Sequence, residues 1–224
     1  MSENGFLTHA QLKTPKAAAI AGIVVSLLLL SILWLLRTSI PADPREPGAW
    51  LATDTRAVTV ALNLVPFAGV AFLWFIGVLR DRLAQLEDRF FATVFFGSGL
   101  LFLAMLFAAA AVIGAIVLVA SVSTPHELMN SATFRFARAA SYIIANVYAI
   151  KMAAVFMIST STVVIRTGIA PRWIAYLGFL LALLLLMGSF FISWSFAVLP
   201  FWVFLISVYI LFDNLRGGSK ADGG

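Results

Sequence analysis

One lysine, Lys151, lies inside a long apolar stretch, where a charged side chain is costly. The run from Ser141 to Ile165 is apolar enough to cross a bilayer. Lys151 lies roughly ten residues into this run, about 15 Å from its outer end at a helical rise of about 1.5 Å per residue. Insertion scales put the cost of a central lysine at about 2.5–3.5 kcal/mol. We therefore expect this cation to meet a polar partner or a ligand.

The polar residues near Lys151 suggest the chemistry of such a site. At about 100° per residue, Tyr148 and Lys151 fall on the same side of a helix as Ser159 and Thr162. Asn146 is close in sequence, and Asn63 in another apolar run offers an amide oxygen. Such a group would suit an anionic substrate or a lipid headgroup near the middle of the bilayer. The candidate binding residues are Lys151, Tyr148, Asn146 and Asn63.

Three interpretations of Lys151 remain open from the residues alone. The first is a structural lysine, neutral or hydrogen-bonded between helices. The second is a binding group for an anionic substrate or a lipid headgroup. The third is a contact for an acidic residue of a partner membrane protein. Burial disfavours the charged form of a lysine in all three cases.

Other chemistries are disfavoured by the residue types present. The chain has no cysteine, and its two histidines, His9 and His126, lie outside the apolar runs. Ser98 and Lys151 would differ by roughly 9 Å in depth on helices, whereas a general base must come within about 3 Å of its partner. We therefore predict no enzyme activity, no metal site and no cofactor.

Composition defines the class of protein that must position these residues. The chain has 224 residues, of which 62% are hydrophobic and 11% are charged. Soluble domains carry about 25% charged residues, and a chain this short cannot bury so much apolar surface. The net charge of +5 is spread over short connections without a basic stripe, so we expect no nucleic-acid partner. The sequence predicts an integral membrane protein.

The apolar runs predict an all-α polytopic fold with six transmembrane helices. A run of some 40 residues from Trp173 to Phe212 would extend about 60 Å as one helix, so we divide it by a turn near Ser189–Ser193. We expect one transmembrane domain over residues 17–212, a cytoplasmic tail over 1–16 and a flexible cytoplasmic tail over 213–224. The predicted spans are about 17–36, 57–79, 91–120, 141–165, 173–188 and 195–212.

Positive charge predicts the orientation of these spans. Cytoplasmic loops are enriched in Lys and Arg. Nine such residues fall on one side: Lys13, Lys16, Arg80, Arg82, Arg89, Arg166, Arg172, Arg216 and Lys220. Five fall on the other: Arg37, Arg45, Arg56, Arg135 and Arg138. We therefore expect both termini to lie in the cytoplasm.

Small residues in the long third run predict close helix packing. Small side chains let the backbones of membrane helices approach one another. The candidate packing residues are Gly97, Gly99, Ala110 and Gly114.

Two stretches carry a resemblance to known sequences. The segment RTGIAPRWIAYLGFLLALLLL, in which a short basic turn with Pro-Arg-Trp opens a Leu/Ala-rich helix, resembles the late-span pattern of several uncharacterised bacterial multi-span membrane protein families. WFIGVLRDRLAQLEDRFFATVFFGSGLLF has a similar character. Arginine well exceeds lysine and alanine is abundant, which favours a GC-rich bacterial genome. The resemblance implies a bacterial cytoplasmic (inner) membrane and no assigned activity.

Two hypotheses for function follow. The first is a small helical subunit or accessory protein of a membrane assembly, whose partners are the lipid bilayer and either another membrane protein or further copies of itself. The second is a small transporter or channel that uses Lys151 with Asn63, Asn146 and Tyr148 as a midplane site for an anion or a lipid headgroup.

Overall fold

The chain folds into a bundle of long helices. The computed structural model describes residues 4–46, 48–53, 55–84, 89–122, 124–188 and 195–221. Within these ranges the regular elements are all helical, which confirms the predicted all-α class. They are α1 (Asn4–Ser39), α2 (Trp50–Thr53), α3 (Arg56–Ala84), α4 (Arg89–Val122), α5 (Pro125–Asn130), α6 (Ala132–Ile143), the π-helix η1 (Ile144–Ala149), α7 (Ile150–Thr167), α8 (Arg172–Gly188) and α9 (Ser195–Ala221).

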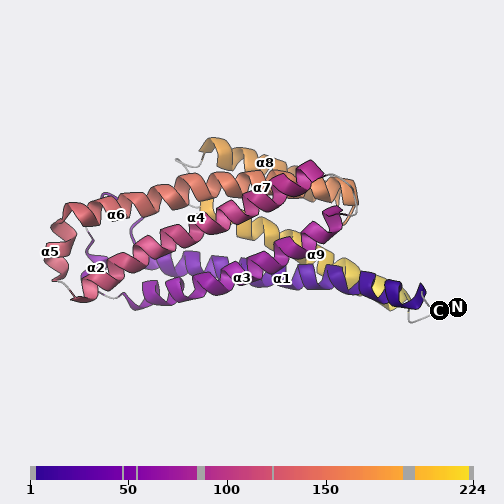
Figure 1. Cartoon of the computed structure of the whole chain (residues 1–224), viewed down its shortest axis with the longest axis horizontal. Helices are drawn as coiled ribbons and strands as arrows, with labels where there is room; N and C mark the ends of the chain where they lie inside the picture. The colour runs from indigo at the N-terminus through magenta and orange to yellow at the C-terminus, as the bar shows by residue number, and fades with distance from the viewer. Residues whose placement is uncertain are drawn as a thin grey trace.

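The long helices run side by side along the longest axis of the molecule (Figure 1). α6, η1 and α7 join into one continuous rod of 36 residues, which we call the α6–α7 rod. α2 and α5 lie at one end of the bundle, which we call the loop end. The beginning of α1 and the end of α9 lie together at the opposite end.

Five helical segments are long and apolar enough to cross a membrane: Ala17–Ser39, Arg56–Arg80, Phe91–Val122, Ala132–Thr167 and Ser195–Asp213. They identify a multi-pass membrane protein and include five of the six predicted spans. α8 matches the predicted span 173–188, but its 17 residues extend only about 26 Å, less than the roughly 30 Å of hydrocarbon. The predicted turn at Ser189–Ser193 lies outside the described residues. Six crossings therefore remain a prediction.

The predicted tails differ from the structure where it describes them. α1 already begins at Asn4 and α9 continues to Ala221. Residues 4–16 and 213–221 thus extend the neighbouring helices, and the expected flexible C-terminal tail is helical up to Ala221. The fourth span also begins earlier than predicted, at Ala132, because α6 runs into η1 without a break.

Two groups of helices make up the bundle. α1 packs against α3 and α9, whereas the α6–α7 rod packs against α4 and, through α7, against α8. α3 contacts α4, and a cluster of phenylalanine rings joins α3, α4 and α7 at this junction. The Phe156 ring lies 5.3 Å from that of Phe72 and 5.0 Å from that of Phe95, and Phe72 also contacts Phe102 edge-on at 5.4 Å. All four rings are buried.

Glycine and serine allow close helix crossings at two places. At Gly22 of α1, an added Cβ would overlap Ser207 Oγ of α9 and approach the Phe75 ring of α3. At Gly178 of α8, an added Cβ would overlap Ser161 Oγ of α7 and the Trp202 ring of α9. Packing of small residues is the usual basis of helix association in membranes.

The glycines expected to pack differ among themselves. A Cβ at Gly99 would lie 3.3 Å from the Phe156 ring, and one at Gly114 would lie 3.8 Å from Leu62. Ala110 is half-buried and packs against the main core. Gly97 departs from the expectation, because a Cβ there would meet nothing within 4 Å among the described residues. Gly99 faces Phe156 of α7 instead, because residues two positions apart on a helix point to nearly opposite sides.

A buried tryptophan ties α8 to α9. Trp202 has no exposed surface, and its Nε1 donates a hydrogen bond to the carbonyl oxygen of Ile174 at 3.2 Å. This contact gives the indole nitrogen a partner inside the bundle, where bilayer hydrocarbon offers none.

A matched pair of alanine substitutions tests the close crossing at Gly178. We expect Gly178→Ala to lower the apparent melting temperature by about 2–12 °C, because overpacking costs about 1–3 kcal/mol. Gly97→Ala should leave it unchanged or raise it, because its Cβ has room and alanine favours the helix by about 1 kcal/mol. Thermal unfolding in detergent, followed by tryptophan fluorescence, measures both. Equal effects would contradict the assigned packing.

Thiol labelling tests the number of crossings, because the chain has no native cysteine. Single cysteines replace the exposed residues Glu46, Arg172 and Leu215. A membrane-impermeant maleimide should label Glu46→Cys in intact cells, and the other two only after permeabilisation. If Leu215→Cys is labelled together with Glu46→Cys, α8 does not cross and the six-span prediction is wrong.

Candidate functional site

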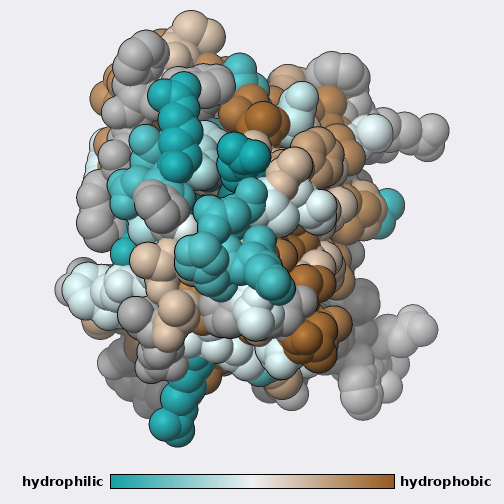
Figure 2. All heavy atoms as spheres, turned by 90° about the vertical axis from the view of Figure 1, so that its left-hand side faces the viewer, coloured by the Kyte–Doolittle hydropathy of each residue, from teal (hydrophilic) through white to brown (hydrophobic). Residues whose placement is uncertain are grey.

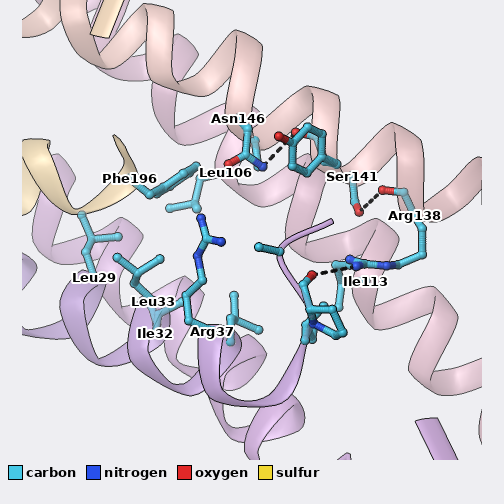
Figure 3. Close-up of a pocket in the computed structure, with 16 residues that line it drawn as sticks. Leu29, Ile32, Leu33, Arg37, Leu106, Ile113, Arg138, Ser141, Asn146 and Phe196 are labelled. Atoms are coloured by element: carbon cyan, nitrogen blue, oxygen red, sulfur yellow. Dashed lines mark hydrogen bonds between the residues drawn. The ribbon is translucent and has the colours of Figure 1, made fainter. Parts of the chain in front are cut away.

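A partly open cavity of about 160 Å³ lies between the two groups of helices, toward the loop end. Its walls come from α1, α4, α6, η1 and α9, with Pro41 and Ala42 after α1. Figure 3 shows Leu29 and Phe196 at one end of the cavity, Arg138 at the other, and the Arg37 side chain between them. The lining is mainly aliphatic, and its polar groups include two arginines. We call it the arginine cavity.

Arg138 of α6 is the most unusual group in the cavity wall. Only 5% of its surface is exposed. Its Nη2 donates a hydrogen bond to the carbonyl oxygen of Pro41 at 3.1 Å, whereas its buried Nε has no acceptor in the described part of the chain. A buried cation is costly unless its charge and its donors find partners. The guanidinium group is thus held in place by one contact and keeps an unused donor.

Arg37 lies in the last turn of α1 and is half-buried. A cation at this position interacts favourably with the negative end of the helix dipole. Its guanidinium group points into the arginine cavity, toward Leu106 and Phe196 (Figure 3). Two arginines from helices far apart in sequence therefore meet one cavity.

Two carboxylates act on Arg138 from the loop after α1. The negative charges of Glu46 and Asp43 attract the positive charge of its guanidinium group. Both side chains are exposed and neither lines the arginine cavity, so water screens them. Asp43 Oδ1 also accepts a hydrogen bond from the backbone nitrogen of Arg45 at 2.8 Å.

The surface of the loop end, which faces the viewer in Figure 2, is hydrophilic across its middle.

The cavity wall includes the π-helix η1. Ala145 and Asn146 of η1 both line the cavity. A π-turn displaces the regular hydrogen bonds of the surrounding α-helix, and Asn146 Nδ2 compensates by donating to the carbonyl oxygen of Tyr142 at 3.1 Å. Short π-helical segments are frequent at functional sites. Sequence reasoning did not predict this feature.

The structure does not gather the four predicted binding residues in one place. Asn146 lines the arginine cavity, whereas Lys151, Tyr148 and Asn63 are not part of its lining. Tyr148 is 55% exposed, and Asn63 is also exposed. Lys151 is half-buried, two residues beyond the end of η1. The prediction assumed a uniform 100° rotation, which the π-helix interrupts.

The hydroxyl groups of Ser159 and Thr162 on α7 form hydrogen bonds within the helix itself. Ser159 and Thr162 donate to the carbonyl oxygens of Val155 and Ile158, each at 3.0 Å. Their hydroxyls therefore belong to the helix backbone network rather than to a site around Lys151. Ser98 likewise donates to the carbonyl oxygen of Phe95 at 3.1 Å.

The arginine cavity was missed because its arginines were counted only as topology charges. A local signal was present, since Arg138, Ser141 and Tyr142 are spaced i, i+3 and i+4 and share one face of a helix. That face lines the cavity. As for metal ions, the described residues contain no group of three or more His, Cys, Asp or Glu.

Comparison with known proteins does not extend this picture. No protein-family model, curated protein or solved structure matches the chain. The resemblance of its late-span segment to uncharacterised bacterial membrane families therefore stays a prediction.

A methionine substitution tests whether Arg138 serves the fold or a ligand. We expect Arg138→Met to keep or raise the apparent melting temperature, because an apolar group replaces an incompletely hydrogen-bonded buried cation. Arg135→Met is the control, since Arg135 lies on the same helix but is exposed. Thermal unfolding in a non-ionic detergent measures both. A large fall for Arg138→Met alone would assign Arg138 to stability.

Proposed function

We propose that this protein is a multi-pass membrane protein that binds an anionic group in the arginine cavity. The single observation that carries the proposal is the Arg138 side chain, which lines the cavity, is only 5% exposed and has a buried Nε donor without an acceptor among the described residues. Arg37 adds a second positive charge from α1. Guanidinium groups match carboxylates and phosphates in both charge and donor geometry.

The donor set favours binding over catalysis. Arginine stays protonated in proteins and does not act as a general base. Of the polar neighbours, Ser141 donates its hydroxyl to the carbonyl oxygen of Arg138, and Asn146 donates to that of Tyr142. These groups hold the cavity wall in shape, and the two arginines supply the charge. We therefore propose a binding protein without enzyme activity.

The proposed setting is a bacterial cytoplasmic membrane, with both termini inside. The excess of Lys and Arg on one side supports this orientation, and the arginine-rich, alanine-rich composition supports the bacterial origin. In that setting the protein is an accessory subunit whose partners are the bilayer and either another membrane protein or a second copy. The apolar side chains exposed along its spans, among them Phe67, Trp74 and Leu118, are suited to lipid or to another membrane helix.

A site at Lys151 is the second candidate, as part of a small transporter or channel. The supporting observation is a half-buried lysine that lies two residues after the π-helix and forms no hydrogen bond or ion pair with another described residue. An ionisable residue inside a membrane span is a candidate functional group by default. The two candidate sites differ in the cation that the anion requires for binding: Arg138 in the first and Lys151 in the second.

One binding experiment distinguishes them. Purified protein in a non-ionic maltoside detergent is titrated with inorganic phosphate and with decyl phosphate, and binding is followed as a rise in apparent melting temperature. We expect at least one of these anions to stabilise the wild type and Lys151→Met, and neither to stabilise Arg138→Met. Decanol is the uncharged control.

The opposite results decide against the arginine cavity. Binding that is lost in Lys151→Met and retained in Arg138→Met would place the anion at Lys151. If neither anion stabilises the wild-type protein, the proposal of an anion-binding function fails.

A further inference from the structure

We infer that the anion bound in the arginine cavity is the headgroup of an amphiphile whose alkyl chain lies along α1. This inference rests on the proposed function and adds the class of ligand. Its basis is the arrangement of the cavity lining, in which Leu29 and Phe196 lie at one end, the Arg138 side chain lies at the other and Arg37 lies between them.

The apolar part of the cavity is long enough to hold a segment of hydrocarbon chain. On α1 the lining extends from Leu29 to Arg37, about 12 Å at about 1.5 Å per residue. Leu33 and Leu36 lie between these two residues, and Phe196 closes the end near Leu29 (Figure 3). A free inorganic anion beside the guanidinium groups would leave this apolar wall without a partner.

The depth of each part in the membrane matches the two ends of a lipid. Leu29 and Leu33 lie ten and six residues before the end of the span Ala17–Ser39. Arg37 lies two residues before the end of the same span, and Pro41, the partner of Arg138, lies beyond it. The arginines thus reach headgroup level, while the aliphatic wall continues into the hydrocarbon.

Partial exposure of the lining favours an amphiphile over a free anion. The cavity is partly open, and Leu33 and Arg37 in its lining are only half-buried. A molecule already dissolved in the bilayer keeps its chain in apolar surroundings as it enters, so only its headgroup exchanges water for the guanidinium donors. A charge-assisted hydrogen bond to the guanidinium group of Arg138 then favours the bound state.

The test compares inorganic phosphate with decyl phosphate, which differ only by the alkyl chain. In the wild type we expect decyl phosphate to raise the apparent melting temperature with a half-maximal concentration at least tenfold lower than that of inorganic phosphate. Leu33→Trp, which fills the apolar part of the cavity, should abolish this difference. Leu27→Trp is the matched control on α1, because Leu27 is 53% exposed and lies outside the cavity; it should keep the difference.

A second measurement covers the case in which Leu33→Trp disturbs the whole site. An alkyl phosphate with a diazirine at the end of its chain should crosslink to residues 29–36 or to Phe196 in the wild type, and much less in Arg138→Met. Crosslinking elsewhere, or crosslinking that is unchanged in Arg138→Met, would overturn the inference.

The failures of the two proposals can be told apart. Equal half-maximal concentrations for the two phosphates, with both responses lost in Arg138→Met, would leave the anion site standing and remove the amphiphile. The same conclusion follows if Leu33→Trp keeps the tenfold preference for decyl phosphate. Absence of any response to either phosphate would remove the anion site as well.

Discussion

Hydrocarbon offers polar groups no hydrogen-bond partner, so the chain must satisfy its own donors and acceptors wherever it crosses the bilayer. Helical backbones meet most of this demand, and several polar side chains in the spans follow the same rule. The hydroxyl of Thr160 donates to the carbonyl oxygen of Phe156 at 2.8 Å, and Asn146 donates to that of Tyr142 at 3.1 Å beside the π-turn. Trp202 Nε1 donates a hydrogen bond to the carbonyl oxygen of Ile174 on a neighbouring helix. Arg138 satisfies the rule only in part: among the described residues its Nη2 has one acceptor and its Nε has none, and the buried hydroxyls of Ser161, Ser195 and Ser207 also have no partner there.

The position of Arg138 beside the arginine cavity follows from how the helices pack. Small residues bring backbones together at Gly22 and Gly178, and phenylalanine rings fill the junction of α3, α4 and α7. α1 belongs to one group of helices and α6 to the other, so the arginine cavity forms between them. The same helix arrangement therefore produces dense packing at the glycines and phenylalanines and leaves the arginine cavity between α1 and α6.

The features predicted correctly from the sequence depend on neighbouring residues alone. Apolar runs about 20 residues long determine where a membrane helix can lie, and they identified the five long spans and the helix α8. The long uninterrupted run from Trp173 to Phe212 exceeded the bilayer thickness, which correctly suggested two helices. The rotation of side chains along the fourth span was predicted less well, because the π-turn at η1 changes it and has no recognised local signal.

By itself the sequence determined the class of protein: an all-helical chain too apolar and too poor in charge to fold in water. Tertiary structure alone decided which cation lines a cavity and which glycines allow close contact. Lys151 was conspicuous because its neighbours are apolar, whereas Arg138 became distinctive only when its helix met a carbonyl 97 residues earlier in the chain. Gly97 and Gly178 look alike in sequence, yet only Gly178 lies against a neighbouring helix. Burial and hydrogen-bond partners depend on residues distant in the chain, and no local pattern specifies them.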